Sequence, residues 1–275
     1  MKPIKSISLS FATLLAALAI ASFSIRAAAF ELNIGIQTWT LRNLNFDQMV
    51  EFAAKHHLKE VEITAMHLNP TGPMDEIKRK REILEKNGLH VYTFGVAGTS
   101  LDKEENRKLF EFAKFMGIKL IIVEPGDFKI FDNLEELVKE YDIKVAIHNH
   151  GLKSMYGNPL VVKNVLKHRD PRIGVCLDVG WATAATLDAA KVYREYEGRV
   201  FDIHLKDKRI EKKTQGEDTS IDTKIGEGQT NLKGLFAELK KSNYNGILAI
   251  ETDGDYKDPT DFVASALKFV KENQP

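Results

Sequence analysis

The feature that most constrains the fold of this chain is a repeated unit, in which a short apolar strand is followed by an amphipathic helix. Apolar residues that alternate or run together predict strands, and apolar residues at helical spacing predict helices. The predicted strands cover residues 33–41, 59–64, 90–97, 119–123, 144–147, 173–177, 200–205 and 246–250. The helix that follows each strand is predicted over residues 46–57, 74–87, 103–116, 134–141, 159–168, 187–196, 232–242 and 261–271.

Eight such units predict a single-domain (β/α)₈ barrel, because parallel strands that alternate with helices close in this way. The 275 residues, 43% of them hydrophobic, are enough for one large core. An open doubly wound sheet is the alternative fold, although the first strand-to-helix turn has no glycine-rich phosphate fingerprint. A long polar segment, residues 206–229, follows the seventh strand and is predicted to be a functional or mobile loop.

Residues 1–29 have the pattern of a signal peptide. Lys2 and Lys5 provide a positive start, residues 11–21 are apolar, and three alanines at 27–29 resemble a cleavage site. We therefore expect a mature barrel domain of residues 30–275 and a periplasmic or secreted bacterial protein. The apolar run is too short to span a bilayer comfortably, so no stable membrane insertion is expected after cleavage; an uncleaved anchor is the alternative.

The charge balance argues for a small, locally recognised partner. Lys+Arg and Asp+Glu number 39 each, so no overall field favours nucleic acid. The single cysteine, Cys176, excludes an internal disulfide, and stability must come from the core. Whether the chain forms an oligomer stays open.

Several later strands end in residues that bind metals. His148 and His150 stand at the end of the fifth strand, Asp178 follows the sixth, His204 lies in the seventh, and Glu251 follows the eighth. Closure of a parallel barrel brings the carboxyl ends of its strands around one mouth. Two imidazoles and two carboxylates suit Mn²⁺, Zn²⁺, Fe²⁺ or Co²⁺. We expect His148, Asp178, His204 and Glu251 to bind one divalent ion, with Mn²⁺ as the first choice.

Other interpretations of these residues stay open. Asp178 taken alone is more typical of a helix cap or a turn than of a ligand. His148 and His150 share one face of their strand, so either could bind the metal while the other contacts substrate. Glu124, at the end of the fourth strand, could complete the metal shell, act as a base, or cap the next segment.

Four further residues are candidates for contact with substrate. Lys206 could polarise a substrate oxygen, or it could be a solvated lysine at a strand end. Trp181 and Trp39 could stack on a sugar face, or they could serve packing. Glu62, at the end of the second strand, is a candidate for binding a substrate hydroxyl.

The motifs LDVGW, HLKD, IGEG at residues 225–228 and the final AIE together resemble the xylose-isomerase-like barrel superfamily, in particular its sugar phosphate isomerase/epimerase group. The resemblance covers the whole mature chain. It implies a divalent metal held by a Glu, an Asp, a His and a Glu at the ends of strands five to eight. The last three correspond to Asp178, His204 and Glu251.

The chain departs from this family pattern at two positions. His148 replaces the fifth-strand Glu, and Trp181 replaces a His that often follows the Asp by three residues. The epimerases of the family use two metal-bound glutamates as an acid/base pair, and here Glu251 alone remains. The IHNHG form instead resembles a subgroup with inosose-dehydratase-like and 3-keto-sugar-processing members.

The expected chemistry is removal of a sugar proton beside a carbonyl, with a divalent ion stabilising the enediolate. Glu251 or His150 is the expected base. Return of the proton gives isomerisation or epimerisation of a free or keto sugar, which is the leading hypothesis. Loss of a neighbouring substituent gives a 3-keto-glycoside lyase or hydratase, or an inosose-dehydratase-like enzyme.

Two other classes of function occur on barrels of this kind. A non-catalytic periplasmic sugar-binding barrel would explain His148 and Trp181 as lost catalytic positions. The same superfamily contains DNA-repair endonucleases, but the missing His after Asp178, the export signal and the neutral charge argue against that class.

Overall fold

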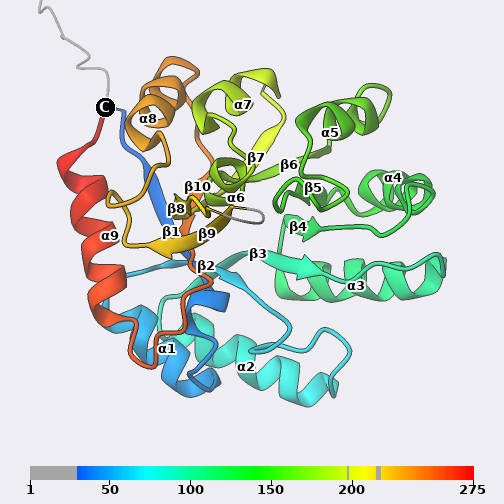
Figure 1. The fold of residues 1–275 in the computed structure, drawn as a ribbon. Coiled ribbons are helices and arrows are strands. Elements are labelled where there is room, and N and C mark those ends of the chain that lie inside the picture. Colours follow the sequence, from blue (N-terminus) through cyan, green and yellow to red (C-terminus); the bar gives the residue numbers. More distant parts are fainter. Residues whose placement is uncertain (1–29, 197, 215–217) are drawn as a thin grey trace, which may run out of the picture.

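The computed structural model describes residues 30–196, 198–214 and 218–275, and the predicted signal peptide lies outside these ranges. Within them, eight parallel strands close into a barrel in the order β1, β10, β7, β6, β5, β4, β3, β2 (Figure 1). The prediction of a single-domain (β/α)₈ barrel is confirmed, and the open doubly wound sheet is wrong because β1 pairs with β10.

The barrel strands are short and largely buried, as expected where helices cover a parallel sheet. They are β1 (Asn33–Gln37), β2 (Glu60–Ile63), β3 (His90–Ala97), β4 (Leu120–Val123), β5 (Lys144–His148), β6 (Ile173–Asp178), β7 (Val200–Leu205) and β10 (Ile247–Ile250). Register places Asp178 of β6 directly opposite His204 of β7. The two residues thus reach the same level of the barrel.

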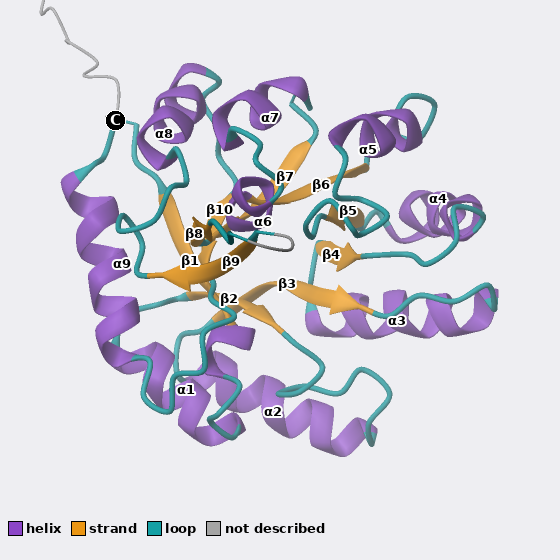
Figure 2. Ribbon diagram, in the orientation of Figure 1, coloured by secondary structure: helices purple, strands orange, loops and turns teal. Residues whose placement is uncertain are grey.

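The helices form the outer layer around these strands (Figure 2). They are α1 (Phe46–Lys55), α2 (Met74–Lys86), α3 (Lys103–Met116), α4 (Ile130–Tyr141), α5 (Pro159–Leu166), α7 (Ala189–Glu195), α8 (Leu232–Lys241) and α9 (Thr260–Glu272). Gly88 and Gly117 follow α2 and α3 with φ of 68° and 77°, the left-handed conformation that ends a helix.

The structure departs from the predicted elements at three places. The first strand ends at Gln37, and the remaining residues of the predicted strand form a 3₁₀ helix, η1 (Thr38–Leu41). The side chain of Gln37 caps this helix by accepting a hydrogen bond from the backbone N–H of Trp39. An additional helix, α6 (Val179–Ala184), directly follows β6. The polar segment 206–229 contains an antiparallel hairpin, β8 (Asp207–Glu211) with β9 (Thr219–Thr223), where a loop was predicted.

The hairpin and α6 both lie close to the ends of the barrel strands. Helix α6 packs against β8 and also contacts β7. In the described part of the chain, no helix has the length and apolar character needed to cross a membrane.

Candidate active site

Four of the predicted site residues meet at the mouth of the barrel. His148 ends β5, Asp178 ends β6, His204 lies near the end of β7, and Glu251 follows β10. Each offers one ligand atom, these atoms lie within 4.8 Å of one another, and all four residues are buried. We refer to His148, Asp178, His204 and Glu251 as the mouth cluster.

The contacts inside the mouth cluster leave several ligand atoms unsatisfied. His204 Nδ1 lies 2.7 Å from Glu251 Oε2, and His148 Nε2 lies 3.7 Å from Asp178 Oδ2. Within the described residues, these four atoms and His148 Nδ1 have no well-aligned hydrogen bond, although they are buried. Because buried polar atoms are nearly always paired, this donor set fits a divalent cation of the Zn²⁺, Mn²⁺, Fe²⁺ and Co²⁺ group.

Asp178 caps a helix and also faces the mouth cluster. Its Oδ1 accepts the backbone N–H of Trp181 at 2.7 Å, which caps the first turn of α6, while Oδ2 points toward His148. The side chain of Asn149 exchanges two hydrogen bonds of 3.0 Å with the Asp178 backbone. Asp178 can therefore cap α6 and also serve as a metal ligand, because the cap uses Oδ1 and leaves Oδ2 for the metal.

Lys206 is buried beside the mouth cluster. Its side chain is 1% exposed, and Nζ lies 3.1 Å from Asp178, 3.3 Å from Glu251 and 3.0 Å from Asp253. Burial alone would lower the pKa of this lysine, but the three carboxylates raise it above its ordinary value. The solvated interpretation is therefore wrong, and Lys206 is an internal cation.

The charge of Lys206 keeps two carboxylates of the mouth cluster ionised. Burial by itself would raise the pKa of Glu251, but Lys206 and His204 lower it well below its usual value. The pKa of Asp178 is also lowered, against the effect of its burial, by Lys206 and by the nearby imidazole of His148.

Glu62 lies inside the barrel, in contact with His204. Its two carboxylate oxygens are 3.0 and 3.1 Å from His204 Nε2, and both side chains are fully buried. A carboxylate only accepts, so Nε2 carries a proton and Nδ1 turns toward the mouth cluster. This position gives Glu62 a histidine as partner, in place of the substrate hydroxyl that the sequence suggested.

Two residues beneath His204 were missed from the sequence. Tyr92 donates a 3.0 Å hydrogen bond to Asp202, and Asp202 Oδ2 lies 3.8 Å from His204 Nε2. Burial and the charge of Glu62 raise the pKa of Asp202 well above its usual value. Alternation along β7 could have identified this residue, because Asp202, His204 and Lys206 share one face of the strand.

His150 and Glu124 form a second pair beside the mouth cluster. His150 Nδ1 lies 2.7 Å from Glu124 Oε2, and His148 Nδ1 lies 3.9 Å from the same oxygen. Burial alone would raise the pKa of Glu124, but the nearby imidazole of His148 and the hydrogen bond from His150 lower it to about 2. The carboxylate is thus ionised and accepts the Nδ1 proton of His150, so Nε2 of this imidazole can act as a base.

The family model for the xylose isomerase-like TIM barrel matches residues 48–273. The chain belongs to this family. An inosose dehydratase of Clostridium perfringens is 26% identical over 242 residues, which cover 72% of this chain and 81% of that protein. A crystal structure of an uncharacterised Parabacteroides distasonis protein covers 88% of this chain and 98% of its own, with a TM-score of 0.67 and 29% identity. The IolI protein, solved with a zinc atom, covers 88% of this chain and 97% of its own, with a TM-score of 0.69 and 16% identity.

The chain belongs to the xylose isomerase-like family but has a histidine, His148, at one position of the expected metal-binding set. His148 occupies the position at the end of β5 where the family resemblance implies a Glu, and its ring lies within the mouth cluster. His150 lies outside that cluster, with 41% of its side chain exposed. The geometry therefore favours His148 as the ligand and leaves His150 available to a substrate.

The mouth cluster opens into a cavity of about 360 Å³ that is lined by His148, His150, Glu251 and Trp39, among others. Trp39 lies on η1 and is 37% exposed, so its ring is available to a ligand. Trp181 lies on α6, with its ring centroid 5.3 Å from that of His150. Both tryptophans are therefore near the mouth, Trp39 after β1 and Trp181 after β6.

Proposed function

We propose that this protein is a metal-dependent enzyme that removes a proton beside the carbonyl of a keto-sugar or keto-cyclitol, and that elimination of a neighbouring hydroxyl is its main outcome. The observation that carries the proposal is the mouth cluster, whose four ligand atoms lie within 4.8 Å of one another. Two of its residues, His148 and Glu251, line a cavity that His150 also lines. The similarity to inosose dehydratases supports the same chemistry.

His148, Asp178, His204 and Glu251 would hold the metal. A divalent ion there would supply Lewis-acid polarisation of a carbonyl oxygen. The choice of Mn²⁺ over other ions stays a prediction, and the zinc in the IolI structure makes Zn²⁺ an equal candidate.

His150 is the proposed base. Its Nδ1 proton is held by Glu124 at 2.7 Å, which directs the lone pair of Nε2 to the cavity. Nε2 accepts the proton from the carbon beside the carbonyl, and the ionised Glu124 stabilises the imidazolium. The same proton then passes to the leaving hydroxyl as its C–O bond breaks, so the net loss is one water molecule.

Lys206 is proposed to maintain the site without receiving the substrate proton. Its ammonium lies within 3.3 Å of Asp178 and Glu251 and is fully enclosed. It balances the two carboxylates of the mouth cluster and keeps them in the ionised form that binds cations. This role replaces the direct polarisation of a substrate oxygen that the sequence suggested.

Isomerisation or epimerisation is the second candidate, and one observation favours it. Glu251 and His150 both line the 360 Å³ cavity, and they come from different strands. A base and an acid on separate walls could remove a proton from one face of a sugar and return it to the other.

One experiment tests the proposal and separates the two outcomes. The chelated protein is reloaded with Mn²⁺, Zn²⁺, Fe²⁺ or Co²⁺ and incubated in D₂O with an inosose and with 3-keto-glucose. Formation of an unsaturated ketone supports the dehydratase, because the carbon beside the carbonyl has lost its hydrogen to the new double bond. Deuterium at that carbon of a rearranged sugar supports the isomerase. Absence of both the unsaturated ketone and deuterium with every metal contradicts both.

We also infer that the protein is exported. Support comes only from the pattern of residues 1–29, with two lysines before an apolar run and an alanine triplet after it. N-terminal sequencing of protein from the periplasm of an expressing bacterium should find a chain that begins near Phe30. An intact residue 1 on cytoplasmic protein would contradict export.

A further inference from the structure

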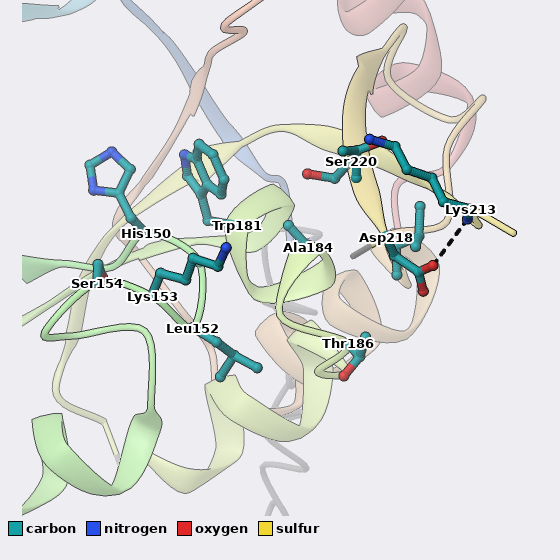
Figure 3. A pocket seen from close by; sticks show the side chains of 13 residues that line it. His150, Leu152, Lys153, Ser154, Trp181, Ala184, Thr186, Lys213, Asp218 and Ser220 are labelled. Carbon is teal, nitrogen blue, oxygen red and sulfur yellow. Dashed lines mark hydrogen bonds between the residues drawn. The ribbon is translucent and has the colours of Figure 1, made fainter. Parts of the chain in front are cut away.

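A second cavity, of about 850 Å³, lies beside the active-site cavity and shares His150 with it. We refer to it as the side groove. Figure 3 shows His150 and Trp181 next to each other at one end and the hairpin residues Asp218 and Ser220 at the other. The proposed reaction on a single ring does not require this space, because the 360 Å³ cavity already contains the mouth cluster residues His148 and Glu251.

Three segments build the side groove. The loop after β5 supplies Leu152, α6 supplies Trp181 and Ala184, and the hairpin supplies Ile210 and Ser220. The hairpin and α6 pack against each other, so these walls are set by contacts within the described fold. The side groove therefore depends on the segment between β7 and α8.

The walls combine apolar surface with hydroxyl groups. Leu152 is 58% exposed, and Trp181 presents a large aromatic ring at another wall of the same groove (Figure 3). The ring of Trp181 is held from one side by Lys208, whose Nζ lies 4.1 Å from the ring centroid. Thr186 and Ser220 add hydroxyls at the other walls. A surface of this kind suits a ring that has an apolar face and polar edges.

Three charged residues line the side groove, Lys153, Lys213 and Asp218. The side chain of Asp218 lies 2.6 Å from Lys212 Nζ and also accepts the backbone N–H of Lys213. The carboxylate of Asp218 is thus paired with groups of the hairpin itself.

We propose that the side groove is the subsite for the second ring of a glycoside, so that the substrate is a keto-sugar still joined to another sugar or to an aromatic group. The inference rests on the proposed function, because it places the reacting ring in the mouth cavity. His150 belongs to both cavities, so the bond between the two rings passes beside this residue. The second ring then lies against Trp181 and Leu152.

The test compares single-ring and two-ring ligands by calorimetry and by kinetics, with the metal-loaded enzyme. The ligands are 3-keto-glucose, a phenyl 3-keto-glucoside and 3-keto-cellobiose, so an aromatic and a sugar second ring are compared. We expect a two-ring ligand to bind at least about tenfold more tightly than 3-keto-glucose, as burial of one ring against Trp181 and Leu152 implies.

Leu152→Asp should remove most of this preference and leave the affinity for 3-keto-glucose unchanged. The matched control is Leu160→Asp, since Leu160 is similarly exposed, at 62% against 58%, and is not among the groove residues. Ala184→Phe provides a second variant, because its ring fills the groove from α6 and adds no charge to the loop that contains Leu152.

The outcomes separate this inference from the proposed function. Deuterium exchange into 3-keto-glucose with no advantage for either two-ring ligand would overturn the side-groove inference alone. An equal loss of the preference for two-ring ligands in Leu152→Asp and Leu160→Asp would overturn it as well. If no ligand loses water or exchanges deuterium with any metal, the proposed function fails first.

Discussion

His204 Nε2 lies 3.0 Å from a carboxylate oxygen of Glu62, and both side chains are fully enclosed by the barrel. The two residues are 142 positions apart in the chain. Glu62 holds the proton of His204 on Nε2, so that Nδ1 faces Glu251 and Asp178. Carboxylates in this relation to a metal-binding histidine fix its tautomer and orientation.

The first prediction concerns metal affinity. Glu62→Gln should weaken binding of Zn²⁺ or Mn²⁺ by about 10–100-fold, because the amide no longer holds His204 with a negative charge. Competition with a chromophoric chelator measures the change. Glu60→Gln is the control, since Glu60 lies on the same strand and also contacts a histidine, His90, at 2.7 Å. Equal effects of the two substitutions would refute the role of Glu62.

A second prediction separates the two histidines after β5. His148→Asn should abolish stoichiometric metal binding, because His148 belongs to the mouth cluster. His150→Asn should keep the metal and slow deuterium exchange by at least about 100-fold, the usual effect of removing a general base. Metal content and exchange rate are measured on the same samples.

The control for His150 is His90→Asn. The Nδ1 atom of His90 also lies 2.7 Å from a glutamate oxygen, but its partner Glu60 is remote from the mouth cluster. We expect wild-type exchange from this variant. If His150→Asn lost its metal together with His148→Asn, the assignment of separate roles would fail.

The third prediction concerns the buried ammonium. Lys206→Met should lower the free energy of unfolding of the metal-free protein by about 3–5 kcal/mol, because Asp178 and Glu251 lose their compensating charge. Urea unfolding with and without Zn²⁺ tests this, and the loss should shrink when metal is bound. Lys212→Met should change stability little, since Lys212 is 78% exposed in its pair with Asp218. A loss of stability of the same size with and without Zn²⁺ would contradict the electrostatic explanation.

A fourth prediction follows from the protonation of His204. Burial alone would lower its pKa, but the charges of Glu62 and Glu251 raise it well above the ordinary value of 6.5. Because the folded pKa exceeds the unfolded one, this histidine stabilises the metal-free protein fully below pH 6.5 and progressively less as pH rises through the raised value. Metal binding to Nδ1 requires loss of a proton, so metal affinity should increase over the same pH range.

Calorimetry in buffers of different ionisation enthalpy measures the protons that the protein releases when the metal binds. Urea unfolding at several pH values measures the stability of the metal-free protein. We expect proton release on binding and opposite pH trends for the metal-free stability and the affinity. An affinity that is constant between neutral and alkaline pH would show that His204 is already neutral.

Much of the fold and of the mouth cluster could be predicted from local pattern. The eight strand and helix units predicted the closed barrel, and the polar endings of β5, β6, β7 and β10 predicted which side chains would converge. The segment 206–229 was harder, because its polar residues carry no clear periodicity. Its hairpin is recognisable only from the pairing of β8 with β9 and from the contact with α6.

Local patterns along the chain were enough to predict the barrel and the residues at its mouth, because the periods of strands and helices are local properties. Three relations come from the folded barrel alone: Glu62 contacts His204, carboxylates enclose Lys206, and His150 joins two cavities. Each of these relations joins residues from different strands or loops. Their distances depend on how the barrel closes and on which side chains share its interior, and no local pattern encodes that.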